Sequence, residues 1–399
     1  MAVSRRLNIL HIFSGDLWAG AEVMVFNLLR RLKEYPGVHL AAISLNEGIL
    51  SSRLKSMGIV THVIPENEFG FWRILERAKE VVSGKRIDVI HAHRYKENLL
   101  ALLLRKGCQP TAALVTTLHG LSEFYSPKDR LTGAVNNFCL RRYFSKVIGV
   151  SKEIERGLIG RYGYPQDAVD VIYNGIEVDN DRIIHDTFQT IHPHTSPLPS
   201  VLGRPTAARE KGAFYEAANG GVFYIGTVGR MVPVKDYDLF IEIAAEIYRQ
   251  RPNAVFSILG EGPLKSELEK RAVEMGLSDV FKFMPPVEDP FPYYRQLDLY
   301  VNTSRHEGIP LSVLEAMSCG VPVVAPAVGG LPEIISSEAE GSLVQQRTPE
   351  NFARACLRLM DNPELRNRIG HRGQERIKAA FTAEKMGEAY YRLYKDITG

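Results

Sequence analysis

The sequence has few of the features that mark secreted, membrane-spanning and nucleic-acid-binding proteins. It has 4 cysteines in 399 residues and no CxxC pair, which argues against a disulfide framework and is typical of reduced core thiols in the cytosol. No apolar run approaches the ~18 residues of a membrane-spanning helix, and the first run, at 7–13, is too short for a signal peptide. A net charge of +3 does not indicate nucleic acid, although it suits anionic ligands. We expect a cytoplasmic protein that at most contacts the inner face of a membrane.

The balance of residue types is that of a globular protein with more than one core. Hydrophobic residues make up 45% of the chain and charged residues 24%, as in folded domains. A chain of 399 residues is too long for one ordinary core. We therefore expect two domains.

Short apolar runs alternate with segments of helical period. Strands are predicted at 7–13, 38–45, 60–65, 87–93, 112–120, 146–151 and 169–176, and again at 222–230, 254–260, 280–285, 298–304 and 321–326. Helices are predicted at 20–35, 51–58, 71–85, 98–107 and 134–144, and again at 236–250, 264–276 and 311–320. This alternation predicts parallel sheets with helices on both faces.

The two βα series are separated by residues 177–220, which are rich in Pro, Ser, His and Gly and show no sustained period. We predict a linker or insertion there. Ligands of doubly wound sheets bind outside the carboxyl ends of the strands. The residues of interest are therefore those that follow strands, and a cleft between the two sheets is the expected site.

Glycine turns join strands to helices at two of these places. Gly20 lies in SGDLWAGAE, and Gly260 and Gly262 lie in LGEGP. Glycine permits close approach of the backbone to a ligand, and a helix N-terminus offers N–H groups to an anion. None of these segments is a full GxGxxG, so a dinucleotide site is poorly supported. An anion site and a plain tight turn both stay open at Gly20.

Histidines end two neighbouring predicted strands. His91 and His93 share one face of their strand, and His119 follows the next strand and precedes a glycine. Three imidazoles leave a metal site open, but no cysteine or carboxylate pattern supports it, and we favour a polar rim for His91 and His93. For His119 we favour a neutral imidazole that hydrogen-bonds a substrate hydroxyl.

Two cations follow the first strand of the second half, in GRMVPVKDYD. Arg230 and Lys235 can converge on a phosphate, the arginine as a bidentate clamp and the lysine as a point charge. The alternative is a pair of solvated surface cations. Asp236 and Asp238 match the DxD metal motif of some sugar transferases, but their position at a helix start favours N-capping.

Two glutamates flank a loop-to-helix junction in HEGIPLSVLEAM. Glu307 lies on the loop and Glu315 inside the helix. Carboxylates suit polyhydroxyl ligands because they accept strong bonds from hydroxyls. Gly308 and Pro310 hold the loop near the expected cleft, and the helix dipole favours an anion there. Glu315 as a plain exposed helix residue is the alternative, but its neighbours are apolar.

Together these segments resemble the retaining glycosyltransferases of the GT-B fold, family 4, also called glycosyl transferases group 1. The resemblance covers almost the whole chain and is strongest in E-x7-E, from Glu307 to Glu315; it also includes GAE, TLHG, GVSK, YNGI, GRMVPVKDYDLFIEIA and LGEGP. It implies two Rossmann-like domains facing across a cleft. Acceptor binding is expected at 1–176, completed by a C-terminal helix at about 383–397, and donor binding at 221–382.

The resemblance implies a nucleotide-diphosphate sugar as donor, with a UDP-sugar favoured over a GDP-sugar. Glu315 is expected to bind ribose hydroxyls and Glu307 to face the transferred sugar. Arg230 and Lys235 are expected to hold the diphosphate, and His119 to touch the sugar. The other donor-binding residues implied are Gly20 at the diphosphate, Gly260, Gly262 and Met284 around the base, and the backbone of Gly308, Ile309, Pro310 and Leu311 at the sugar.

The implied reaction is a front-face displacement that retains the anomeric configuration and needs no metal or cofactor. His119, Glu307, Arg230 and Lys235 form the expected catalytic set, with the cations in the electrostatic role of a metal. Two departures from the family pattern stand out. Ala19-Gly20 replaces Gly-Gly, and Lys235-Asp236 replaces Lys-Gly, so that an aspartate tempers the positive potential beside the lysine.

The acceptor is expected on the first domain, near Tyr95, Lys96 and Tyr125, and a lipid-linked or envelope glycan is the favoured class. The 137–146 region also predicts peripheral contact with an anionic membrane, although an ordinary solvated helix face stays open. The residues for this contact are Arg141, Arg142, Lys146, Phe138, Leu140 and Phe144.

Two other functions are weighed against a transferase. One is a nucleotide-sugar epimerase or hydrolase of the same fold, which needs no acceptor. The other is a catalytically silent protein that binds nucleotide sugars; the presence of Glu307, Glu315, Arg230, Lys235 and His119 argues against it.

Overall fold

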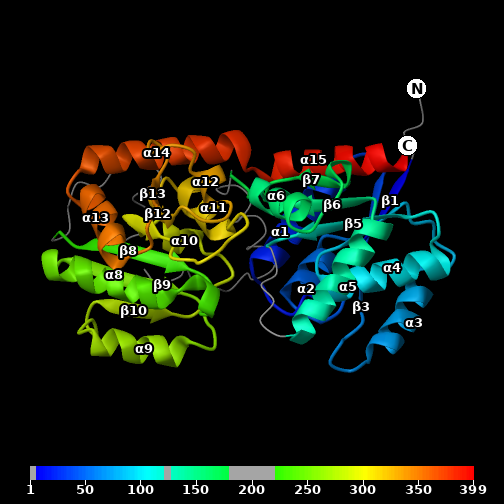
Figure 1. Ribbon diagram of the computed structural model, residues 1–399, viewed down its shortest axis with the longest axis horizontal. Helices are drawn as coiled ribbons and strands as arrows, with labels where there is room; N and C mark the ends of the chain where they lie inside the picture. Colours follow the sequence, from blue (N-terminus) through cyan, green and yellow to red (C-terminus); the bar gives the residue numbers. More distant parts are fainter. Residues whose placement is uncertain (1–5, 121–126, 179–220) are drawn as a thin grey trace. The chain divides into compact units, whose positions relative to one another are not determined.

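The computed structural model describes residues 6–120, 127–178 and 221–399, which form two compact α/β units (Figure 1). The first unit combines Met1–Gly175 with Ala383–Gly399, and the second is Ile176–Thr382. Most of the predicted linker, and Tyr125 among the acceptor candidates, lie outside the described residues.

The first unit is built on a seven-stranded sheet in the order β3-β2-β1-β4-β5-β6-β7. All neighbouring strands in it pair in parallel, which confirms the predicted topology. The strands are β1 (Leu7–Phe13), β2 (Val38–Ser44), β3 (Val60–Val63), β4 (Val89–Ala92), β5 (Ala113–Leu118), β6 (Lys146–Gly149) and β7 (Val169–Val171). The helices are α1 (Gly20–Lys33), α2 (Ile49–Ser56), α3 (Phe71–Val82), α4 (Tyr95–Cys108), α5 (Pro127–Tyr143), α6 (Lys152–Gly160) and α15 (Ala383–Thr398), with a 3-10 turn η1 at Gln166–Ala168.

The strands of the first unit are apolar along most of their length because helices cover both faces of a parallel sheet. In β1 every residue except Asn8 is buried. The last helix of the chain, α15, packs on α1 of this unit, and its Tyr390 and Tyr394 are buried there. Residues from the two ends of the chain thus share one core.

The second unit is built on a six-stranded sheet in the order β10-β9-β8-β11-β12-β13, and its neighbouring strands are also parallel. The strands are β8 (Phe223–Val228), β9 (Ala254–Leu259), β10 (Phe281–Met284), β11 (Leu299–Val301), β12 (Val323–Pro326) and β13 (Ser342–Val344). The helices are α8 (Tyr237–Gln250), α9 (Lys265–Glu274), α10 (Phe291–Tyr294), α11 (Leu311–Ser318), α12 (Leu331–Ile334), α13 (Pro349–Met360) and α14 (Pro363–Ala380), with a 3-10 turn η3 at Pro233–Lys235.

The core of the second unit lies between its sheet and the helices α8 and α13, which pack on each other. Phe240, Phe256 and Phe281 form a buried aromatic group within it. This core anchors the strands whose carboxyl ends carry the candidate donor residues. In neither unit do the described helices include one that is both long and apolar enough to cross a membrane.

Candidate active site

Lys235 and Glu307 form an ion pair at the carboxyl end of the second sheet. Lys235 ends η3 after β8, and Glu307 lies on the loop after β11, the strand that pairs with β8. Both side chains are largely buried, with 20% and 15% of their surface exposed. The Ser304 hydroxyl donates to Glu307 Oε1 at 2.7 Å, and the Thr303 hydroxyl donates to the Lys235 carbonyl at 2.9 Å. The structure therefore brings two predicted catalytic residues together.

The pair keeps the lysine cationic. Burial favours the neutral amine, but the charge of Glu307 and its hydrogen bond outweigh burial and raise the pKa of Lys235 above its ordinary value. A lysine buried without such a partner would have a lowered pKa. Lys235 is thus charged at neutral pH, as a ligand for phosphate must be.

Two predictions about Asp236, next to this lysine, are wrong: that it caps α8 and that it tempers the positive potential beside Lys235. It does not cap α8, since the helix start has no side-chain hydrogen bond from it. Its carboxylate instead pairs with Arg305 at 3.1 Å and with Arg347, so its charge is neutralised by arginines rather than set against Lys235. Its φ of 53° lies in the left-handed region that glycine adopts most easily, which explains why glycine suits this position. Asp238 is exposed in the first turn of α8.

A pair of glycines holds the loop that carries Glu307. The Gly330 N–H donates to the Glu307 carbonyl at 3.0 Å. A Cβ at Gly329 would lie 1.9 Å from that carbonyl oxygen, and a Cβ at Gly330 would lie 2.0 Å from the Gly308 carbonyl oxygen. Only glycine permits this close packing of two loops. The sequence signal was the VGG that follows the strand at 321–326, to which the sequence analysis gave no role.

The predicted sugar-binding backbone lies between this loop and the helix. Gly308, Ile309 and Pro310 are buried, and α11 begins at Leu311 with Pro310 at its N-cap position. Within the described residues the N-terminus of α11 has no side-chain cap. Its first N–H groups are therefore suited to a ligand acceptor.

Glu315 lies one turn into α11 and accepts a hydrogen bond from Tyr294 on α10, at 2.8 Å. Burial, with a smaller contribution from Asp289, raises the pKa of Glu315 from 4.5 to about 7, although the Tyr294 bond opposes the shift. Glu315 is therefore not the plain exposed helix residue of the alternative. Tyr294 was missed from the sequence because nothing in FPYY marks which tyrosine faces the helix α11.

Gly260 and Gly262 serve contacts between two loops of the protein itself. A Cβ at Gly260 would lie 2.1 Å from the Gly229 carbonyl oxygen, and a Cβ at Gly262 would lie 2.4 Å from the Met231 carbonyl oxygen. The Gly260 N–H donates to the carbonyl of Met284, at the end of β10, at 2.9 Å. These residues shape the carboxyl edge of the second sheet, and their contact with a base stays a prediction. Arg230, in the same edge, is exposed.

In the first unit, Gly20 begins α1 and is exposed, with open space where a Cβ would lie. His119 follows β5 and is half-buried. Burial, aided by the charge of Arg94, lowers the pKa of His119 to about 4, so the imidazole is neutral at pH 7. Its Nε2 is buried without a hydrogen-bond partner among the described residues, and so can bond a substrate group.

His91 and His93 are buried, which corrects the prediction of a polar rim. With His11 of β1, which the sequence analysis did not single out, they form a group whose ligand atoms lie within 4.8 Å of one another. Hydrogen bonds already engage this group. His91 bonds Tyr394 at 2.6 Å and Thr117 at 2.9 Å, and His11 bonds His93 at 3.3 Å. Burial lowers the pKa of all three, so they are neutral core histidines. Among the described residues, His11 Nε2 and His93 Nδ1 have no hydrogen-bond partner.

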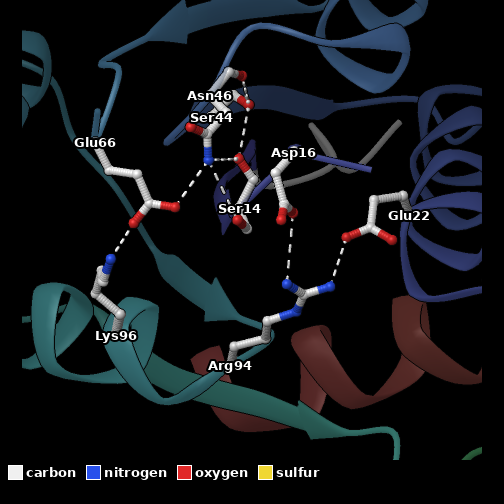
Figure 2. Close-up of polar contacts among 8 residues, drawn as sticks. All are labelled: Ser14, Asp16, Glu22, Ser44, Asn46, Glu66, Arg94 and Lys96. Carbon is white, nitrogen blue, oxygen red and sulfur yellow. Dashed lines mark hydrogen bonds and ion pairs between the residues drawn. The ribbon is translucent and has the colours of Figure 1, made fainter. Parts of the chain in front are cut away.

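The acceptor candidates begin α4. Tyr95 is exposed, and Lys96 forms an ion pair with Glu66, which also accepts from Asn46 at 2.9 Å (Figure 2). Arg94, the residue before them, links Glu22 at 2.8 Å with Asp16 at 3.5 Å. Sequence reasoning missed this network because its members come from four segments that each follow a different strand.

The membrane candidates lie on α5 and on the residues directly after it, and only some of them are exposed. Leu140 and Phe144 are buried and belong to the core, which corrects their place in the prediction. Lys146 pairs with Asp170 at 2.9 Å. Phe138 is exposed, and so are Leu131 and Val135, which the prediction did not include. The exposed Arg141 and Arg142 lie in the last turn of α5.

The sheets and their carboxyl-edge residues define a GT-B glycosyltransferase, and comparison with known proteins identifies the family. The model described as Glycosyltransferase Family 4 matches residues 18–180, and the model described as Glycosyl transferases group 1 matches residues 209–376. A D-inositol 3-phosphate glycosyltransferase of Frankia alni is 31% identical over 306 residues, which cover 71% of this chain and 68% of that protein. The chain belongs to this family of glycosyltransferases and is an enzyme.

Other similar proteins match over nearly the full length. An uncharacterized glycosyltransferase of Methanocaldococcus jannaschii is 26% identical, with 95% of each chain covered. The structure of Anabaena HepE in complex with UDP and glucose superposes with a TM-score of 0.76 at 19% identity, covering 98% of this chain and 100% of that chain. At this identity the likeness establishes the fold.

Proposed function

We propose that the enzyme transfers a sugar from a nucleotide-diphosphate sugar to a hydroxyl of a lipid-linked or envelope glycan, with retention at the anomeric carbon and without a metal. A UDP-sugar is the favoured donor. Two observations support this choice: the Lys235–Glu307 pair beside the uncapped start of α11, and the fold shared with Anabaena HepE, solved with UDP-glucose.

In the proposed reaction the bond from the anomeric carbon to the diphosphate oxygen breaks and a bond to the acceptor oxygen forms on the same face. The acceptor proton passes to the leaving diphosphate. Lys235, Arg230 and the α11 N-terminus stabilise the negative charge that develops there. Glu307 holds Lys235 charged and faces the developing positive charge on the sugar ring. Neutral His119 offers a hydrogen bond to a sugar hydroxyl.

The buried, charged Lys235 is the observation that carries the proposal, and its removal tests it. Lys235→Ala should weaken binding of UDP by at least about tenfold while leaving binding of uridine nearly unchanged, since a charge-assisted bond to phosphate contributes ~1.5–3 kcal/mol. Isothermal titration calorimetry measures both. Lys378→Ala, which removes an exposed lysine of the same unit, is the matched control. Equal losses for UDP and uridine would refute the phosphate role.

The metal-free reaction has its own test. Release of UDP from the donor in the presence of acceptor should persist in EDTA, because Lys235 and Arg230 supply the positive charge. Loss of activity that manganese restores would show that a metal is needed. Breakdown of the donor at the same rate with and without acceptor would instead indicate a hydrolase or an epimerase.

The lipid-linked acceptor is supported by one face of α5. Leu131, Val135, Phe138 and Arg142 lie at positions that share a helix face, and the three apolar side chains are 68%, 44% and 65% exposed. Residues 131–143 contain two arginines and no acidic residue. An exposed apolar stripe beside cations suits an anionic bilayer.

Vesicle binding tests this surface. The enzyme should sediment with vesicles that contain phosphatidylglycerol and not with neutral phosphatidylcholine vesicles, and Phe138→Ser with Arg142→Glu should abolish the binding. Arg73→Glu, at an exposed arginine of α3, is the control. Equal binding by both variants would exclude α5 as the contact.

A further inference from the structure

Seven polar side chains of the first unit gather at the carboxyl ends of four adjacent strands, β3, β2, β1 and β4 (Figure 2). We call them the β1–β4 cluster. Its members are Ser14, Asp16, Glu22, Asn46, Glu66, Arg94 and Lys96. This is the edge of a doubly wound sheet at which ligands bind.

The positive charge of Arg94 is committed within the protein. Its guanidinium bonds Glu22, whose side chain is only 4% exposed, and also faces Asp16. Drawing Arg94 away toward a ligand would leave the buried Glu22 carboxylate uncompensated, and breaking a buried pair in this way is strongly destabilising. Arg94 is therefore unsuited to bind a second anion.

Lys96 is also neutralised, by Glu66. Glu66 is itself fixed by the Asn46 amide, which contacts Ser14 as well, at 3.2 Å to its carbonyl and 3.3 Å to its hydroxyl. Burial would raise the pKa of Glu66, but the bonds from Lys96 and Asn46 outweigh it and lower the pKa. Glu66 is thus an ionised carboxylate. Burial raises the pKa of Glu22, and the charge of Arg94 opposes this shift. With Glu22 ionised beside Arg94, three carboxylates against two cations give the cluster one net negative charge.

Two buried atoms indicate that the cluster meets a ligand. Among the described residues, Glu22 Oε2 and His93 Nδ1 are buried without a hydrogen-bond partner. His93 directly precedes Arg94. Buried polar atoms are nearly always bonded. The ring of His93, the residue before Arg94, stacks on the ring of His119 with the centroids 6.0 Å apart. The cluster therefore adjoins the predicted sugar-contacting residue of the first unit.

We infer that the β1–β4 cluster binds the acceptor through hydroxyls of an uncharged sugar or polyol and disfavours an acceptor that carries a phosphate there. The inference rests on the proposed transferase function. Carboxylates and an amide oxygen accept bonds from hydroxyls, whereas a phosphate would meet net negative charge and two cations already engaged. A preference for uncharged acceptors would distinguish this enzyme from relatives whose names refer to inositol 3-phosphate.

Matched acceptor pairs test the inference. UDP release is measured with the UDP-sugar that raises the melting temperature most, and with myo-inositol against inositol 3-phosphate and methyl glucoside against glucose 6-phosphate. The neutral member of each pair should give kcat/KM higher by at least about tenfold, as expected for like charges a few ångströms apart near a protein surface. Preference for the phosphorylated members would overturn the inference.

Charge removal gives the second arm. Asp16→Asn with Glu66→Gln makes the cluster net positive, so the preference for neutral acceptors should shrink or reverse. Glu76→Gln, which removes an exposed carboxylate of α3 in the same unit, should leave the preference unchanged. An unaltered preference in the double variant would refute the role of the cluster. Melting temperatures check that each variant is folded.

Direct binding decides the case in which no tested acceptor turns over. With the donor site saturated by UDP, glucose 6-phosphate should bind the double variant at least about fivefold more tightly than the wild type; equal binding would contradict the inference. If the transferase proposal itself is wrong, the result differs from these outcomes. The protein then neither binds UDP nor breaks down any UDP-sugar, which is seen before an acceptor is added.

Discussion

The carboxylate of Glu315 lies among apolar neighbours. Tyr294 donates one hydrogen bond, and burial raises the pKa from 4.5 to about 7. Protonated and ionised forms are therefore both populated at neutral pH. A ribose hydroxyl that donates to Glu315 stabilises the ionised form, so donor binding and proton release are linked.

The linkage predicts a pH dependence. The folded state holds the Glu315 proton more tightly than the unfolded state, so the stability of the second unit should fall as pH rises from about 4.5 to about 7. Binding of UDP should instead strengthen from pH 6 to pH 8 by up to about tenfold, as the carboxylate ionises.

Calorimetric titration across this range measures the effect. Glu315→Gln is the control, because its amide does not ionise and any remaining pH dependence comes from UDP itself. The pH profile of UDP affinity should be flatter for this variant than for the wild type. Identical profiles for the two proteins would show that Glu315 does not contact the ligand.

Single residues also show where sequence reasoning stops. Glu307 and Lys235 could be predicted because each follows a strand, and parallel strands place such residues at one edge. The partners of Asp236 could not, because Arg305 and Arg347 lie far away in sequence. His91 was misjudged because alternation in a strand separates two faces but does not tell that both are buried.

At the scale of elements, two loops of the second unit depend on each other. The loop carrying Glu307 packs on Gly329 and Gly330 with no room for a Cβ. Gly329→Ala should therefore move this loop, lowering both the melting temperature and the affinity for UDP. The positive φ of 60° adds strain of about 1 kcal/mol or more.

Gly276→Ala separates these two causes. Gly276 has a similar φ of 72°, but no atom lies within 4 Å of its Cβ position, so only the backbone strain applies. It should lower stability by about 1 kcal/mol and leave UDP affinity unchanged. If both variants lose UDP affinity equally, loop packing does not hold the donor site.

Elements that consist of a continuous apolar run were predicted well, whereas one short strand and two helices near the C-terminal end of the second unit were not. β1 and β9 match the predicted apolar runs closely, because a strand buried on both faces is a continuous apolar segment. The helices α13 and α14 and the strand β13 were not predicted. β13 has only three residues, and α14 is strongly charged, with a mixed surface in which the apolar stripe is weak.

At the scale of the whole molecule, the chain returns to its first unit at the end. Tyr394 on α15 hydrogen-bonds His91, and Tyr390 bonds Thr117 at 2.7 Å. Tyr394→Phe leaves the buried His91 nitrogen unsatisfied and should reduce the free energy of unfolding of the first unit by ~1–3 kcal/mol. Hydrogen exchange of β4 and β5 should accelerate while β8 and β9 stay protected.

Tyr391→Phe is the matched control, on the same helix at a half-buried position stacked on Tyr35. It keeps the ring and should change exchange little. Faster exchange in both units after Tyr394→Phe would show that the two units unfold together rather than separately.

The position of α15 also bears on how the protein is made. Residues 6–175 are synthesised long before Ala383–Gly399, so the unit that is begun first lacks one of its own helices until the whole second unit has been synthesised. The second unit is contiguous at Ile176–Thr382 and needs no later part of the chain. The unit that is begun first is therefore the one that depends on the later segment of the chain.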